Sequence, residues 1–242
     1  KLQARWQSSD AYHGAVVMGM ALWGTVIGAI FGGIPTNTFG RKKTLLAIGV
    51  LYALSAIGTA LSNDPYIFAF FRFMGGLGVG ASTIAAPAYI SEIAPAKDRG
   101  RLVSLYQFNI VLGILVAFLS NYLLSGIGDN DWRWMLGVQA IPASIYTLCV
   151  LIIPESPRWL VSKGRINEAK NVVKIVNPDQ DSDLLISQME DDHAEAPKEN
   201  IFMKKYRFPL MLAFLVAFFN QMSGINAFLY YAPRIFGEAG LG

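Results

Sequence analysis

Long apolar stretches alternate with short charged segments along this chain. Five stretches contain no Asp, Glu, Lys or Arg, and they cover residues 14–40, 44–63, 102–128, 134–153 and 208–233. A sixth, residues 65–91, is interrupted only by Arg72. Each stretch reaches about 20 residues, the length that a helix needs to cross the hydrocarbon core of a bilayer. The pattern therefore predicts six membrane-spanning helices.

The last of these stretches has a polar centre. Asn220, Gln221, Ser223 and Asn226 lie where the middle of the bilayer is expected. An amide in hydrocarbon costs free energy unless it meets a hydrogen-bonding partner or water. The residues leave two interpretations open, which are hydrogen bonding between helices and a polar surface on a water-filled cavity. We favour the cavity.

Composition supports a membrane protein and excludes other classes. Charged residues make up 15% of the 242 residues, against about 25% in soluble domains. The net charge of +3 gives no indication of a nucleic-acid partner. The single cysteine, Cys149, cannot form a disulfide within the chain. No Walker A sequence, catalytic triad or metal-ligand cluster is present in the sequence, so we expect neither an enzyme nor a cofactor.

Glycines at four-residue spacing predict close contacts between helices. Gly24, Gly28 and Gly32 share one face of the first predicted helix, and Gly76 and Gly80 share a face of the third. The glycine-rich run at residues 75–80 resembles a nucleotide-binding loop. That interpretation fails because the loop requires a preceding strand in a βαβ unit.

Residues 154–207 differ from the rest of the chain. They hold 9 of the 20 Lys and Arg residues and 10 of the 17 Asp and Glu residues. Ser156 and Pro157 indicate a helix start, and Gly164 can end that helix. Apolar residues at helical spacing predict two further short helices; they are Ile166, Ala169, Val173 and Val176, then Leu184, Leu185 and Met189. We expect an aqueous helical linker on the membrane surface.

The distribution of basic residues predicts the orientation. The segments after the first, third and fifth predicted spans carry 3, 3 and 9 Lys or Arg residues, and the opposite side carries 4. Basic residues concentrate on the cytoplasmic side of membrane proteins. The linker is therefore expected in the cytoplasm, with both ends of this sequence outside the cell.

Five motifs occur in a fixed order along the chain. They are GIPTNTFGRK at residues 33–42, RFMGGLGVG at 72–80, PAYISE at 87–92 followed by Arg99 and Gly100, PESPRWL at 154–160, and QMSGIN at 221–226 followed by Tyr230 and Tyr231. In these motifs and their order the chain resembles the sugar porter family of the major facilitator superfamily. The resemblance covers nearly the whole sequence.

The resemblance implies an all-α membrane protein, with an incomplete helical bundle of the major facilitator type. Family members have twelve helices in two bundles of six, and this chain is similar to helices two to seven. It implies an N-terminal bundle without its first helix at residues 1–153, a cytoplasmic helical linker at 154–207, and the first helix of the C-terminal bundle at 208–242. We therefore expect this sequence to be a fragment that lacks the first helix of the family.

The resemblance also assigns sites. It implies sugar contacts by polar and aromatic residues of two helices, namely Gln107, Asn220, Gln221, Asn226 and Tyr230. An amide both donates and accepts, and so it matches a sugar hydroxyl. A conformational switch of ion pairs at the cytoplasmic ends of the helices is implied for Arg41, Glu92, Arg99, Glu155 and Arg158. Ordinary interfacial charges and helix packing are the alternatives for these residues.

Three departures from the family pattern matter. Asn37 stands where the family motif has Asp, which predicts a weaker cytoplasmic latch. Asn220 replaces the first of two paired glutamines, which favours a change in substrate preference. Arg72 is implied as a proton-coupling partner of an acidic residue on helix one, a helix that this sequence does not contain. The alternative is that the Arg72 side chain snorkels to the outer membrane surface.

The sequence predicts a carrier that moves a monosaccharide or polyol across the cell membrane by alternating access, with or without protons. Its partners are then the sugar or polyol, protons and the lipid bilayer. The alternative is a nutrient sensor that resembles a carrier and binds sugar without transport.

Overall fold

The computed structural model describes residues 19–95, 97–128, 130–178, 181–194, 203–224 and 240. Regular structure in these ranges is entirely helical, as predicted. Four segments are long and apolar enough to cross a membrane: α5 (Arg41–Leu61), α6 (Pro65–Ile93), α7 (Arg99–Leu124), and α8 (Asp131–Gly137) together with α9 (Ala140–Ile152). The bent pair α3 (Gly19–Phe31) and α4 (Gly33–Phe39) makes a fifth.

Helix α13 (Arg207–Met222) corresponds to the start of the sixth predicted span. The short 3₁₀ helix η2 (Lys204–Tyr206) precedes it, and both lie in a second compact unit, residues 195–242, separate from residues 1–194. The predicted span at 208–233 is described only as far as Gly224. Helix α13 ends at Met222, and Gly224 takes a φ of 74°.

Two of the predicted spans are broken, and each break lies four residues before a proline. Proline has no N–H to donate to the carbonyl four residues earlier, and its ring clashes with that carbonyl. Pro35 explains why α3 stops at Phe31 and α4 continues at an angle of 48°. Pro142 explains the break near Val138, between α8 and α9. The first predicted span is therefore a bent pair of helices in its described part, whereas residues 131–152 still form one candidate span with a short break in the helix.

Helices α3 and α6 pack backbone to backbone, as the glycine spacing predicted. A Cβ atom added to Gly24 would overlap the carbonyl oxygen of Phe73, and one added to Gly76 would overlap that of Ala21. A Cβ atom on Gly80 would likewise overlap the carbonyl of Thr25. Small residues allow this close approach, which gives two apolar helices a large van der Waals contact in a membrane.

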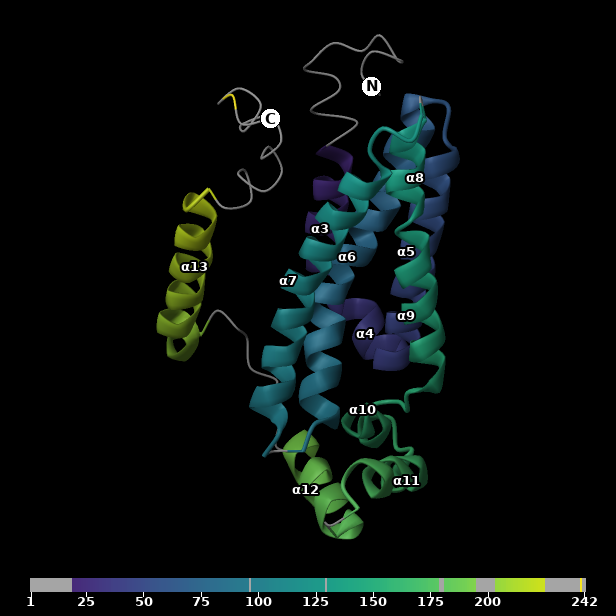
Figure 1. Cartoon of the computed structure of the whole chain (residues 1–242). Helices are drawn as coiled ribbons and strands as arrows, with labels where there is room; N and C mark the ends of the chain where they lie inside the picture. The colour runs from purple at the N-terminus through teal and green to yellow at the C-terminus, as the bar shows by residue number, and fades with distance from the viewer. Residues whose placement is uncertain are drawn as a thin grey trace. The chain divides into compact units, whose positions relative to one another are not determined.

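Three short helices gather at one end of the bundle (Figure 1). They are α10 (Pro157–Ser162), α11 (Ile166–Val176) and α12 (Ser182–Ala194), and we call them the linker module. Their shared core includes Leu160, Val173 and Ile186. Leu184, one of the apolar residues that predicted α12, is 57% exposed, whereas Ile186 is buried. Outside this core, Lys170 donates to Asp183 and lowers the pKa of that carboxyl group.

Substitution of Gly76 by Ala tests the glycine contact. The new methyl group must displace α3, and we expect a loss of about 1–3 kcal/mol in the free energy of unfolding. Thermal unfolding of the detergent-solubilised full-length protein measures it. Gly100→Ala is the matched control, because nothing lies within 4 Å of a Cβ atom there. Equal unfolding midpoints for the two variants would contradict the packing described.

Candidate functional site

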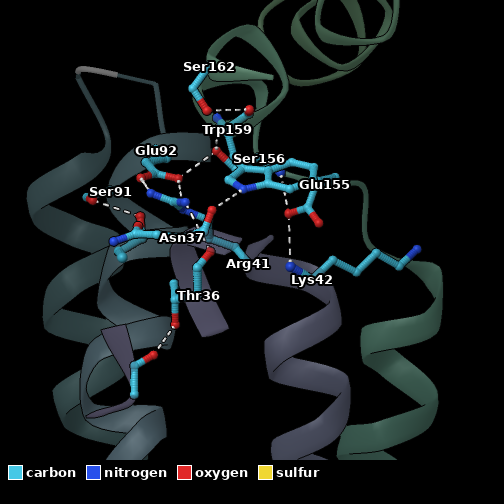
Figure 2. A network of polar contacts seen from close by, with 12 residues as sticks. Thr36, Asn37, Arg41, Lys42, Ser91, Glu92, Glu155, Ser156, Trp159 and Ser162 are labelled. Carbon is cyan, nitrogen blue, oxygen red and sulfur yellow. Dashed lines mark hydrogen bonds and ion pairs between the residues drawn. The ribbon is translucent and has the colours of Figure 1, made fainter. Parts of the chain in front are cut away.

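A carboxylate at the C-terminal end of α6 is the centre of a polar network at the end of the bundle nearest α10, the linker-side end (Figure 2). Arg41, the first residue of α5, donates from Nε to Oε2 of Glu92 and from Nη2 to Oε1, both at 2.8 Å. The two side chains are only 14% and 15% exposed. A bidentate ion pair of this kind fixes the relative orientation of the two side chains as well as pairing their charges. It therefore holds the start of α5 against the end of α6.

Ser156 connects this ion pair to the linker module. Its hydroxyl donates to Oε2 of Glu92 at 2.6 Å and accepts the N–H of Trp159 at 3.2 Å. The second bond caps the N-terminus of α10, as the sequence predicted. Ser156 is completely buried. One hydroxyl therefore both starts a helix and links that helix to the charged pair.

Glu155 holds the turn between α4 and α5 by a main-chain contact. Its Oε1 atom accepts the backbone N–H of Lys42 and that of Ser156, each at 2.9 Å. The turn passes through Gly40, whose φ of 100° is rarely adopted by other residues. A Cβ atom at Gly40 would also overlap the carboxylate of Glu155. Glycine is therefore needed at this position for both its conformation and its size.

The other two predicted switch residues lie outside this network. Arg158 pairs with Asp192 at 3.3 Å within the linker module, where both side chains are exposed. Arg99 is exposed at the first residue of α7. Among the described residues, no hydrogen bond or ion pair joins Arg99 to the network. The structure thus brings together Arg41, Glu92 and Glu155.

The predicted sugar-contact residues are distributed over both units. Gln107 is exposed on α7, in the first unit. Asn220 and Gln221 are exposed at the end of α13, in the second unit. Asn226 and Tyr230 lie outside the described residues. Their roles remain predictions.

The predicted proton-coupling residue, Arg72, lies in the second turn of α6 and is partly buried. Asp64, which caps the start of the same helix, accepts the N–H groups of Tyr66 and Ile67. Arg72 therefore sits close to the end of the bundle opposite the linker module, and its coupling role remains a prediction.

Sequence reasoning missed two members of the network. Ser156 was recognised as a helix cap, and its bond to Glu92 was not foreseen. Trp159 donates from its indole nitrogen to the carbonyl oxygen of Asn37 at 2.9 Å, and no sequence pattern indicated that acceptor. The only signal was the position of both residues in the PESPRWL motif at 154–160.

The chain matches the family described as "Sugar (and other) transporter" over residues 3–242. The chain belongs to this family. The resemblance to sugar porters is thereby confirmed, together with the fold class of an incomplete helical bundle in a multi-pass membrane protein. Members of the family are transporters and not enzymes.

Several bacterial relatives carry the names of sugar transporters. The chain is 37% identical over 232 residues to a D-xylose transporter of Levilactobacillus brevis, covering 93% of this chain and 50% of that protein. It is 32% identical over 246 residues to the D-xylose-proton symporter of Escherichia coli, covering 91% of this chain and 50% of that protein. The chain thus spans about half the length of the curated relatives it matches.

Solved structures agree with this assignment. A proton:xylose symporter of the major facilitator superfamily, XylE, bound to 6-bromo-6-deoxy-D-glucose, matches with a TM-score of 0.85 and 30% identity over 99% of this chain and 56% of that chain. The E. coli xylose transporter in a partially occluded inward-open conformation gives a TM-score of 0.82 and 30% identity, over 95% of this chain and 58% of that chain.

Removal of the Ser156 hydroxyl tests the double role assigned to it. Ser156→Ala loses both the cap of α10 and the donor to Glu92, and we expect the free energy of unfolding to fall by about 1–2 kcal/mol. Ser91→Ala is the control, because Ser91 lies beside Glu92 and donates only to the carbonyl of Ala88 in its own helix. Thermal unfolding should separate the two variants clearly. Identical midpoints would show that neither the cap nor the bond to Glu92 contributes to stability.

Proposed function

We propose that the full-length protein carries a monosaccharide or polyol across the cell membrane by alternating access. The family supports this proposal, and so do the names of relatives that transport D-xylose or glucose. The observation that carries it is the polar network at the linker-side end. A carrier needs a contact that closes one end of its pathway and can be broken again. Buried ion pairs and hydrogen bonds between helix ends meet that need.

The switch consists in the first place of Arg41, Glu92 and Glu155. These groups join the turn between α4 and α5, the end of α6 and the start of α10. Arg99 and Arg158 are proposed to contribute in the complete protein, where a second bundle faces this end. The network forms in the state that is closed at the linker-side end and breaks when that end opens.

The sugar is proposed to bind between the two bundles. Gln107 on α7 supplies one amide, and Asn220, Gln221 and Asn226 supply others, with Tyr230 as an aromatic contact. Amides suit sugar hydroxyls because each offers a donor and an acceptor. The end of α13 at Met222 and the positive φ of Gly224 support this arrangement, because substrate sites of transporters commonly lie where a helix is interrupted.

Orientation and proton coupling complete the proposal. The excess of Lys and Arg on one side favours a cytoplasmic position for the linker module. Both ends of the present sequence then lie outside. Arg72 is proposed as the cationic partner of a carboxylate on a preceding helix, and some relatives are named proton symporters. This arrangement predicts uptake that depends on external pH.

Transport by purified full-length protein in proteoliposomes tests the function. We expect saturable counterflow, in which a preloaded unlabelled sugar drives uptake of the labelled one. A panel of pentoses, hexoses and polyols, assayed at several pH values, identifies the substrate and the coupling. Sugar binding without any flux would contradict the carrier and support the nutrient-sensor alternative.

Substitutions in the predicted cavity test the substrate site. We expect Gln221→Ala and Asn226→Ala each to weaken sugar affinity by about 10-fold or more, since each removes a hydrogen bond to a hydroxyl and leaves that group unpaired. Expression should be unchanged. Gln188→Ala, on the exposed surface of α12, is the matched control. Wild-type affinity in both cavity variants would refute the assignment.

A further inference from the structure

Trp159 connects the linker module to α4 across a large distance in sequence. Its indole Nε1 donates to the carbonyl oxygen of Asn37 at 2.9 Å (Figure 2). The indole lies against Gly40, where an added Cβ atom would be 3.3 Å from its ring. The side chain is 7% exposed. A buried donor with a defined acceptor fixes the position of α4 relative to α10.

Helix α4, which Trp159 contacts, is separated from α3 by a bend. The axis bends by 48° between α3 and α4, because Pro35 cannot continue the hydrogen-bond ladder. The carbonyl of Gly32 is 3.4 Å from the N–H of Thr36 but 2.7 Å from its hydroxyl, so a side chain replaces part of the ladder at the bend. Meanwhile α3 is fixed to α6 by its glycine contacts. A displacement at Asn37 can therefore change the bend without separating α3 from α6.

The linker module holds α4 through a main-chain atom, because Trp159 binds the carbonyl of Asn37. The bond from Glu155 to the N–H of Lys42 reaches the start of α5 and belongs to the network proposed to break when the linker-side end opens. The side chain of Asn37 is exposed and takes no part in either contact. Neither bond depends on whether residue 37 is an amide or a carboxylate.

From these contacts we propose that Trp159 is a positioning residue that fastens α4 to the linker module, so that the two move together about the bend at Gly32–Pro35. The proposal rests on the proposed transport function. A latch weakened at the Asn37 side chain would leave this fastening intact, because the fastening is made by the indole and a backbone carbonyl.

Distance measurements between spin labels test the coupled movement in the full-length protein. Cys149 is replaced by Ser, and labels are placed on the exposed positions Thr38 of α4 and Asn167 of α11. A second pair joins Leu22 of α3 to Thr38, across the bend. On addition of transported sugar, we expect the first distance to stay constant and the second to change. A change in the first distance as large as that in the second would overturn the proposal, and so would a constant second distance.

Removal of the indole donor tests the role of Trp159 itself. Trp159→Phe keeps an aromatic ring and loses the N–H, so we expect a broader distance distribution between positions 38 and 167. Asn37→Ala and Asn37→Asp should leave that distribution unchanged. Trp132→Phe is the matched control, because Trp132 is also 7% exposed and lies in α8, at the opposite end of the bundle (Figure 1). An unaltered distribution in Trp159→Phe would refute the assignment.

Transport kinetics separate a positioning role from general damage. We expect Trp159→Phe to change the maximal uptake rate by about 3- to 10-fold, the factor that corresponds to one hydrogen bond, with sugar affinity within about twofold of wild type. Loss of affinity in proportion to rate would overturn the proposal. If the wild-type protein does not transport sugar, the proposed function fails, whereas the effect of Trp159→Phe on the distance between positions 38 and 167 still tests the fastening.

Discussion

The carboxylate of Glu92 lies at the C-terminal end of an apolar helix that is long enough to cross a membrane, and a largely buried charge there requires partners. Arg41 supplies two donors to it and Ser156 supplies a third. Two of these bonds come from the start of α5, and the third comes from the residue that caps α10. The bonds that neutralise the Glu92 carboxylate therefore also join α5, α6 and α10. Because the pair is largely buried, removal of either partner would leave a poorly solvated charge. Because of this free-energy cost, the ion pair is the main contact that holds the helix ends together at the linker-side end.

The bundle combines two kinds of contact with different mechanical properties. Glycine contacts between α3 and α6 are made of backbone atoms in van der Waals contact. The linker-side network consists of charged and polar groups, which water can solvate once they separate. Closure by such groups can be reversed, whereas a backbone contact is not expected to open. This division suits the proposed carrier, which would open one end while the bundle remains intact.

Much of the architecture was predictable because local chemistry determines it. The helix cap at Asp64, the cap at Ser156 and the positive φ of Gly164 follow from residue type and position alone. The glycine faces of α3 and α6 followed from four-residue spacing. The breaks near Phe31 and Val138 were missed, although Pro35 and Pro142 mark both of them. Proline inside a membrane helix is often tolerated, as Pro87 is within the continuous helix α6, and so its presence alone does not predict a break.

The candidate site was less predictable because its contacts join residues far apart in sequence. Motifs identified Arg41, Glu92 and Glu155 as switch residues, and the structure brings these three together. The pairing of Arg158 with Asp192 within the linker module depends on how α10 and α12 pack, which no motif encodes. The bond from Trp159 to Asn37 involves a backbone carbonyl, and the identity of residue 37 carries no information about it.

The most direct test of the central claim is a double-mutant cycle on Arg41 and Glu92 in the full-length protein. The readout is the labelling rate, by a soluble thiol reagent, of a cysteine placed at Ser91, in a background that carries Cys149→Ser. That rate reports how often the linker-side end opens. We predict that Arg41→Ala and Glu92→Ala each accelerate labelling, and that the double variant is no faster than either single one, with a coupling of at least about 1.5 kcal/mol. Effects that add to within about 0.5 kcal/mol would show that the two residues act independently and would contradict the switch.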